Sequence, residues 1–287
     1  MHSKSMDLSK PAAQGMAAKV HYRVEVLSHA AHLWQVTMTI AAPASSQALR
    51  MPVWIPGSYL VREFSKHLHS LQCRQGGRPV GLTQTDKAAW VVACDQAIPL
   101  EVRYQVYAFD HSVRTACLDD VRGFFNATSL CLMAQGQTAL PHGLELLRGP
   151  AMQGWQVATG LEPQRVDVAG FGRYLAKDYD ELADCPVEMG SFWSGEFTAC
   201  GVPHRFVVSG ALPSMDGERL LRDAQKICET QICFWHAPGA LPVKGLAKRV
   251  PFKRYVFMLH CVDDGYGGLE HRNSTALIAN RRDLPRS

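Results

Sequence analysis

A short glycine-rich segment followed by a carboxylate is the part of this sequence best suited to bind a ligand. Gly267 and Gly268 precede Leu269, Glu270 and His271. Consecutive glycines let a second backbone approach closely, as when an extended peptide lies along a sheet edge. The carboxylate can bind a cationic amine through a charge-assisted hydrogen bond. The spacing therefore suits a site that holds the free N-terminus of a peptide, and it also fits a plain glycine turn with Glu270 exposed.

A second segment, residues 51–64, places a Pro-Gly-Ser turn between bulky apolar residues. Turn residues beside aromatic side chains favour a structural role. We expect this turn to bury Trp54 and Tyr59. Arg62 and Glu63 are available as an ion pair.

The sequence gives weaker support for a metal site than for a peptide-binding site. His67 and His69 would share one side of a strand, and His29 with His32 would lie in or beside a hairpin loop. Neither pair has an evident third ligand, which favours surface histidines. Four carboxylates lack the EF-hand spacing, so a solvated acidic loop fits better than a calcium site. They are Asp178, Asp180, Glu181 and Asp184.

Charge and composition narrow the possible functions. Thirty Lys and Arg against 26 Asp and Glu give a net charge of +4, scattered along 287 residues, which argues against nucleic-acid binding. One local group of cations fits a charged surface loop, with an acidic partner as the alternative. Its members are Lys244, Lys248, Arg249, Lys253 and Arg254. The nine cysteines form no CxxC pair, and no signal peptide or membrane span is evident, so we expect reduced thiols and a cytoplasmic protein.

Hydrophobic periodicity predicts a mainly β protein with some α structure. Apolar residues alternate over 20–26 and 34–40, which indicates two half-buried antiparallel strands, and the period of two returns at 100–106. The first half therefore resembles a β-sandwich. From Asp216 the spacing becomes helical as far as Trp235, with Asp216 as the N-cap. Further strands are expected at 90–92, 155–157, 196–198, 204–209 and 255–259.

Four segments in order resemble landmarks of the glycyl aminopeptidase family of zinc metallopeptidases. They are WIPGSYLVREFSKHL (54–68), DYDELADCPVEMGSF (178–192), VPHRFVVSG (202–210) and DDGYGGLEHRNSTALIANRRDLP (263–285). The resemblance implies an N-terminal β-sandwich followed by a thermolysin-like catalytic domain. Together with the polar, Ala-rich start of the chain and a change of pattern near Phe171, it predicts a disordered tail (1–18), the sandwich (19–172) and the incomplete opening portion of the catalytic domain (173–287).

The same resemblance assigns roles to residues. Gly267, Gly268, Leu269, Glu270 and His271 correspond to the edge strand that receives the substrate's N-terminus, with a preference for small first residues. His271 stands where relatives commonly have asparagine. The complete enzyme is expected to use zinc bound through HExxH, but no His-Glu dipeptide occurs here, so no catalytic or metal-ligating residue is assigned.

We therefore expect this chain to bind a peptide N-terminus, to hydrolyse nothing alone, and to self-associate through the exposed face of its incomplete domain. The alternative is a stand-alone, non-catalytic β-sandwich that binds a ligand or mediates association. GxSxG and Gly-rich phosphate-loop motifs are absent, which excludes the corresponding serine hydrolases and nucleotide-binding proteins.

Overall fold

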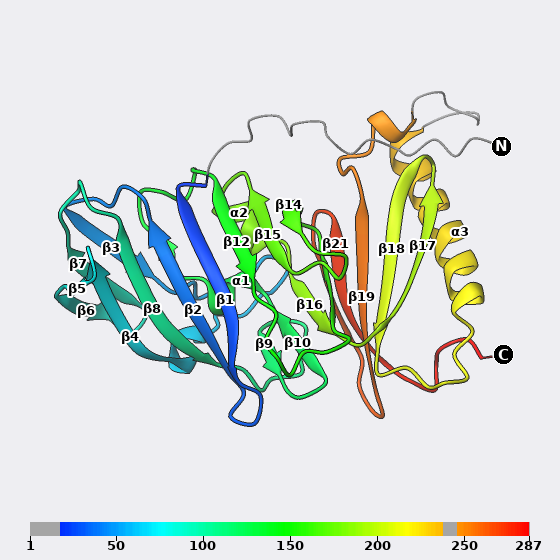
Figure 1. Ribbon diagram of the computed structural model, residues 1–287. Coiled ribbons are helices and arrows are strands. Elements are labelled where there is room, and N and C mark those ends of the chain that lie inside the picture. Colours follow the sequence, from blue (N-terminus) through cyan, green and yellow to red (C-terminus); the bar gives the residue numbers. More distant parts are fainter. Residues whose placement is uncertain (1–17, 238–245, 287) are drawn as a thin grey trace, which may run out of the picture.

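The computed structural model describes residues 18–237 and 246–286 (Figure 1). Strands dominate these residues and form four sheets, which confirms the predicted mainly β fold. The predicted disordered tail, apart from residue 18, lies outside the described residues, as does Lys244 of the cation group. No helix in the described ranges is both long and apolar enough to cross a membrane.

The largest sheet has eight strands in the order β14, β15, β12, β1, β2, β8, β4 and β5. The antiparallel pair β1 and β2 confirms the two strands predicted from alternation, and β8 lies beside β2. The bounds are β1 Val20–Ser28, β2 Leu33–Ile40, β4 Leu68–Gln75, β5 Arg78–Pro79, β8 Leu100–Tyr107, β12 His142–Leu146, β14 Glu162–Val166 and β15 Gly172–Ala176.

Two four-stranded sheets pack against the large sheet and complete the sandwich. Their orders are β13, β16, β10, β9 and β11, β3, β7, β6. A continuous core joins all three sheets, and within it Trp34 of β2 and Phe125 of β10 meet edge to face at 5.8 Å. The bounds are β3 Ser46–Arg50, β6 Leu82–Asp86, β7 Ala89–Ala93, β9 Ala116–Leu118, β10 Arg122–Phe125, β11 Met133–Ala134, β13 Gln156–Thr159 and β16 Val187–Gly190.

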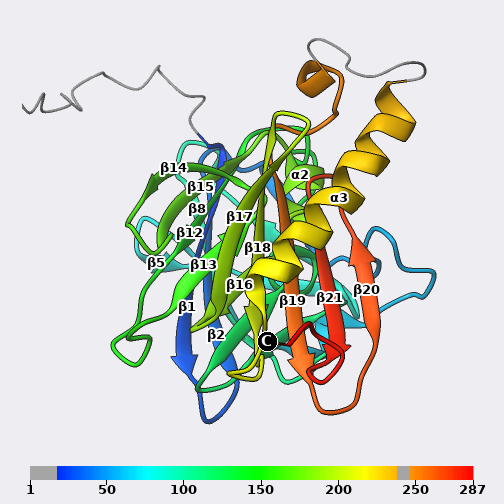
Figure 2. The same ribbon diagram turned by 90° about the vertical axis from the view of Figure 1, so that its right-hand side faces the viewer.

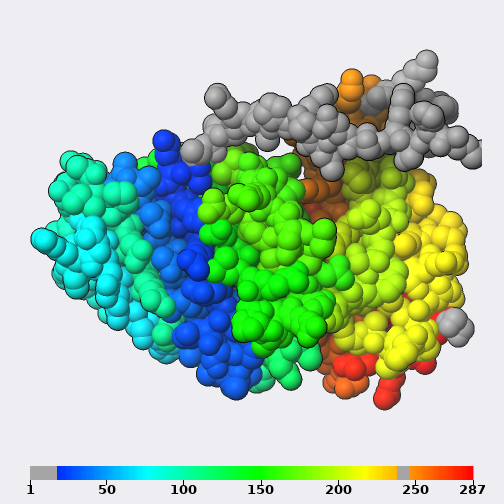
Figure 3. Space-filling model, viewed as in Figure 1, coloured from blue at the N-terminus to red at the C-terminus, as the bar shows by residue number. Residues whose placement is uncertain are grey.

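The fourth sheet is mixed and has the order β17, β18, β19, β21, β20. Strands β18, β19 and β21 run parallel, whereas β17 and β20 are antiparallel to their neighbours. The sandwich lies on one side of this sheet and helix α3 on the other (Figures 1 and 3). The bounds are β17 Trp193–Ala199, β18 Val202–Ser209, β19 Tyr255–Val262, β20 Gly267–Glu270 and β21 Ser274–Asn280.

Helix α3 confirms the predicted helix and its start. Asp216 is the N-cap, and its carboxylate accepts a hydrogen bond from the Arg219 backbone N–H at 2.9 Å. Helix α3 spans Gly217–His236. The other helical segments are short: η1 Phe64–His67, α1 Ala127–Leu130, α2 Tyr179–Ala183 and η2 Leu246–Lys248. Strand pairing passes from the sandwich sheets to the fourth sheet between Gly190 and Trp193. The division into domains at residue 172 stays a prediction.

Candidate functional site

Strand β20 carries the predicted peptide-binding residues and forms an outer edge of the fourth sheet. It pairs on one side only, with β21, in a register that sets Gly268 opposite Leu277. Figure 2 shows β20 at the outer side of the sheet, beyond the face that α3 crosses. The other side of β20 therefore presents main-chain groups that an added extended chain could pair with.

Side chains along β20 alternate as a half-buried strand requires. Leu269 is buried and joins the sandwich core, whereas Glu270 is exposed. Glu270 Oε1 lies 3.7 Å from the position that a Cβ would take on Gly268. The carboxylate thus folds back over Gly268, two residues earlier in the strand. The ion pairs among the described residues do not include Glu270, which leaves its carboxylate available to a ligand.

His271 differs from its neighbour because it is buried and held by another carboxylate. Its Nδ1 lies 3.0 Å from Asp184 Oδ1, and the Arg272 backbone N–H donates to Asp184 Oδ2 at 3.2 Å. The Arg272 side chain also approaches Asp184, with Nε 3.1 Å from Oδ2. One buried carboxylate therefore fixes the chain where it leaves β20. His271 is therefore packed against Asp184, and its predicted role in substrate binding stays a prediction.

The acidic run before this carboxylate is not a solvated loop, which corrects the expectation from sequence. Asp178 caps α2 by accepting the Glu181 backbone N–H at 2.7 Å, and Asp184 is only 5% exposed. A capping residue followed by a helical turn is the signal that was available in the sequence. The partnership of Asp184 with His271 spans 87 residues and had no local signal.

The turn of residues 51–64 also corrects an expectation, because Trp54 and Tyr59 are not buried. Trp54 is 52% exposed and Tyr59 is fully exposed. Glu63 pairs with Lys87 instead of Arg62. The Arg62 guanidinium instead donates to Ser58 Oγ at 3.2 Å. The segment buries Met51 and Ile55 in the core instead.

This turn lies against β20. A Cβ on Gly57 would be 2.8 Å from Leu269 Cδ1 and 3.6 Å from the Glu270 carbonyl oxygen. Figure 2 shows this part of the chain, in blue, extending beside the open edge of β20. The turn that contacts β20, and the residue before β20, also carry exposed apolar side chains, and such side chains can mark interaction sites. They are Trp54, Tyr59, Leu60 and Val61 of the turn, with Tyr266 just before β20.

The histidines considered as metal ligands are mainly packing groups. His32 stacks on Phe109 with ring centroids 3.8 Å apart, and His29 stacks on Trp155. Among the residues that the structure describes, no group of three or more His, Cys, Asp or Glu side chains is arranged to hold a metal ion. The side chains in these described ranges therefore do not fit a zinc site.

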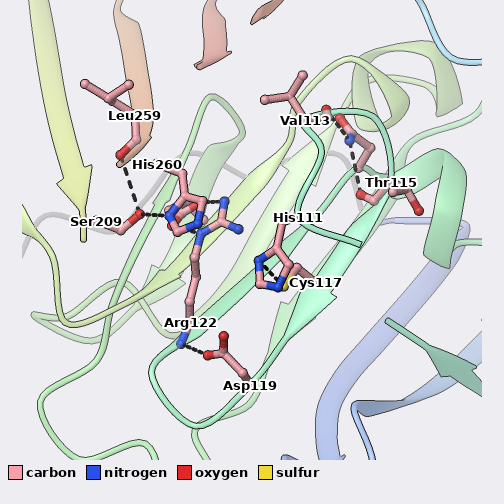
Figure 4. Close-up of polar contacts among 11 residues, drawn as sticks. His111, Val113, Thr115, Cys117, Asp119, Arg122, Ser209, Leu259 and His260 are labelled. Carbon is pink, nitrogen blue, oxygen red and sulfur yellow. Dashed lines mark hydrogen bonds and ion pairs between the residues drawn. The ribbon is translucent and has the colours of Figure 1, made fainter. Parts of the chain in front are cut away.

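A polar network that sequence reasoning missed joins the sandwich to the fourth sheet (Figure 4). Ser209 Oγ of β18 lies 3.1 Å from His260 Nδ1 of β19, and the His260 ring stacks with His111 at 6.1 Å. Arg122 nearby makes a buried bidentate pair with Glu188, with N–O distances of 2.8 and 2.7 Å. Burial, with the neighbouring Arg122, lowers the pKa of His260 to about 3. The contact between His260 and His111 is therefore a structural contact between the fourth sheet and the sandwich.

Two cavities between the sandwich and the fourth sheet do not involve Glu270. One of about 370 Å³ is lined by residues that include Tyr174, Arg205 and Tyr255. The other, of about 350 Å³, reaches Asp184 and Arg272. The candidate site is therefore an exposed strand edge with a carboxylate, beside an apolar turn.

Solved structures share this architecture. An M1 zinc metallopeptidase from Deinococcus radiodurans shares the fold, with a TM-score of 0.51 and 11% identity over 93% of this chain and 61% of that chain. An aminopeptidase N family protein from Idiomarina loihiensis is much more similar, with a TM-score of 0.86 and 41% identity. That match covers 93% of this chain and 43% of the other, so this chain spans less than half of that relative.

The residues of the sandwich identify the family. Residues 21–191 match the model of the Peptidase M61 N-terminal domain, which is more than half of the chain. The chain belongs to this family. No curated protein matches it.

Proposed function

We propose that this chain is the substrate-recognising N-terminal portion of a zinc aminopeptidase of the glycyl aminopeptidase type. The observation that carries the proposal is the open edge of β20 with the Glu270 carboxylate folded over Gly268 and free of ion pairs to other described residues. The 41% identity to an aminopeptidase N family protein supports the class of activity.

Main-chain pairing with β20 would align a peptide substrate. An extended peptide can add to a free strand edge, because its N–H and C=O groups complete the ladder. Gly267 has open space where a side chain would begin. The peptide backbone can therefore approach β20 closely at this position.

Glu270 would select the free N-terminus of that peptide. An ammonium group donates to a carboxylate in a charge-assisted hydrogen bond, which an acetylated terminus cannot make. Asp184 holds His271 and Arg272 directly after Glu270, and this anchors the backbone from which the carboxylate projects. The asparagine that relatives commonly carry is thus replaced by a histidine with a structural partner.

Peptide hydrolysis needs catalytic groups in addition to the binding edge of β20. The complete enzyme would use zinc to activate water, but neither the HExxH motif nor a fitting ligand set is present in the described residues of this chain. We therefore expect the chain by itself to bind peptide without cleaving it. A preference for small first residues, the cytoplasmic location and self-association all stay predictions. The exposed Ile227, Phe234 and Trp235 of α3 favour self-association.

Peptide titration followed by NMR tests where binding occurs. The ¹⁵N-labelled chain is titrated with Gly-Ala-Ala and, separately, with N-acetyl-Gly-Ala-Ala. We expect the free peptide to shift the amide signals of residues 267–270 in a saturable manner, and the acetylated peptide to bind more weakly. Shifts confined to other strands, or equal binding of the two peptides, would contradict the proposal.

A further inference from the structure

Two cysteines that are distant in sequence meet where a hairpin touches α3. Cys200 lies in the turn between β17 and β18, and Cys233 lies in the last turn and a half of α3. Their Sγ atoms are 3.8 Å apart. A disulfide bond is about 2.05 Å long, so the sulfurs must approach by about 1.8 Å, which small side-chain rotations can supply.

The surroundings hold these thiols in place without sealing them from solvent. The Cys200 thiol also donates a weak hydrogen bond to the Glu229 carbonyl oxygen, at 4.0 Å. Both cysteines are only partly buried, at the rim of a small apolar cluster that includes Ala199 and Ile232. A small oxidant can therefore reach a pair that the fold has already brought together.

The backbone at Cys200 supports a specific role for this position. Its φ of 50° lies in the left-handed region, which glycine and asparagine adopt more readily than cysteine. Gly201 follows with a φ of 83°. The tight turn aims the Cys200 side chain at α3.

We propose that Cys200 and Cys233 form a redox-modification site, at which an oxidant of the disulfide class links the β17–β18 turn covalently to α3. One thiolate attacks glutathione disulfide and releases one glutathione thiolate. The second cysteine then attacks the mixed disulfide and releases another glutathione. In total the two protein thiols lose two electrons and two protons, and one glutathione disulfide becomes two glutathione molecules.

The reaction should be slow at neutral pH. Burial and the hydrogen bond with Cys233 raise the pKa of Cys200 to about 11, and the Glu229 carboxylate acts in the same direction. Only the thiolate attacks, so when Cys200 is the attacking residue the rate should rise about tenfold per pH unit below that pKa. The site therefore responds to a sustained oxidising environment more than to a brief pulse.

The expected effect is on stability. The cross-link joins residues 33 apart in sequence and restricts the unfolded chain. We expect the oxidised chain to melt roughly 5–10 °C above the reduced chain.

The experiment incubates the folded chain with glutathione disulfide at pH 8.5, blocks the remaining thiols, digests without reduction, and quantifies cross-linked peptides by mass spectrometry. We expect a Cys200–Cys233 peptide, lost in Cys200→Ser and in Cys233→Ser. Cys228→Ser removes another partly buried thiol of α3 and serves as the matched control, which should keep the cross-link and the rise in Tm. A folded chain without the cross-link, a different pairing of Cys233, or a cross-link with unchanged Tm would overturn the proposal.

Discussion

Gly57 of the exposed turn packs directly on Leu269 of the edge strand β20, although 212 residues separate them in sequence. Gly57 has a φ of 80°, and a Cβ there would lie only 2.8 Å from Leu269 Cδ1. The contact joins the WIPGSY turn of the sandwich to the candidate binding edge. Residues recognised only as separate sequence landmarks are therefore parts of one surface.

Gly57→Ala should destabilise the fold and weaken peptide binding at β20. Alanine has a side chain, so the left-handed backbone conformation at this position costs about 1–2 kcal/mol. The added Cβ also clashes with Leu269. Gly77→Ala is the matched control, since Gly77 has a φ of 77° but nothing within 4 Å of its Cβ position. Urea unfolding and peptide titration of both variants give the comparison. Equal losses of stability and affinity would show that the Leu269 contact is unimportant.

Glu188→Gln should be strongly destabilising. It leaves Arg122 charged, 7% exposed and without its carboxylate, and breaking such a buried pair typically costs about 3–5 kcal/mol. Glu145→Gln removes the partner of Arg173, which is 61% exposed, and should cost at most about 1 kcal/mol. Urea unfolding of both variants at pH 7 measures the difference. A Glu188→Gln cost as small as that of Glu145→Gln would contradict a buried ion pair that water does not screen.

His260 should make the fold weaker in acid. Burial and the nearby Arg122, His111 and Arg281 lower its pKa from 6.5 to about 3, so below pH 6.5 the unfolded chain binds a proton that the folded chain does not. Stability from this group is therefore complete above pH 6.5 and is lost as pH falls toward 3, by about 1.4 kcal/mol per pH unit.

His260→Asn should remove that part of the pH dependence while keeping a side-chain amide that can hydrogen-bond to the Ser209 hydroxyl. His69→Asn, at an exposed position, serves as the control and should leave the slope unchanged. Unfolding free energies of the three proteins between pH 4 and 7 give the slopes. If His260→Asn and the wild type had the same slope, His260 would not be a buried neutral group.

Local periodicity predicted the elements well because the signals lie in neighbouring residues. The alternation of 20–26 and 34–40 identified β1 and β2, and the capping carboxylate of Asp216 marked the start of α3. The glycines and Glu270 indicated the edge strand, although the family resemblance was needed to favour it over a plain turn. That β20 lies at the edge of the sheet was then confirmed.

Long-range partnerships were beyond the same reasoning. Asp184 looked like a member of a solvated acidic run, yet it is buried because His271 and Arg272 reach it from the far end of the chain. Trp54 and Tyr59 looked like core residues, but the turn that holds them lies at a surface beside β20. Burial depends on which segments meet, and neither position carries that information in its neighbours.

The central claim is that Glu270 binds the α-ammonium group of a peptide. The decisive measurement is the dissociation constant of Gly-Ala-Ala and of N-acetyl-Gly-Ala-Ala for wild type, Glu270→Gln and the control Asp264→Asn, which alters an exposed carboxylate just before β20. Loss of a charge-assisted hydrogen bond costs about 1.5–3 kcal/mol, so Glu270→Gln should weaken the free peptide roughly ten- to hundred-fold and leave the acetylated peptide unchanged. Asp264→Asn should change neither. Equal weakening of both peptides by Glu270→Gln, or no weakening of either, would contradict the claim.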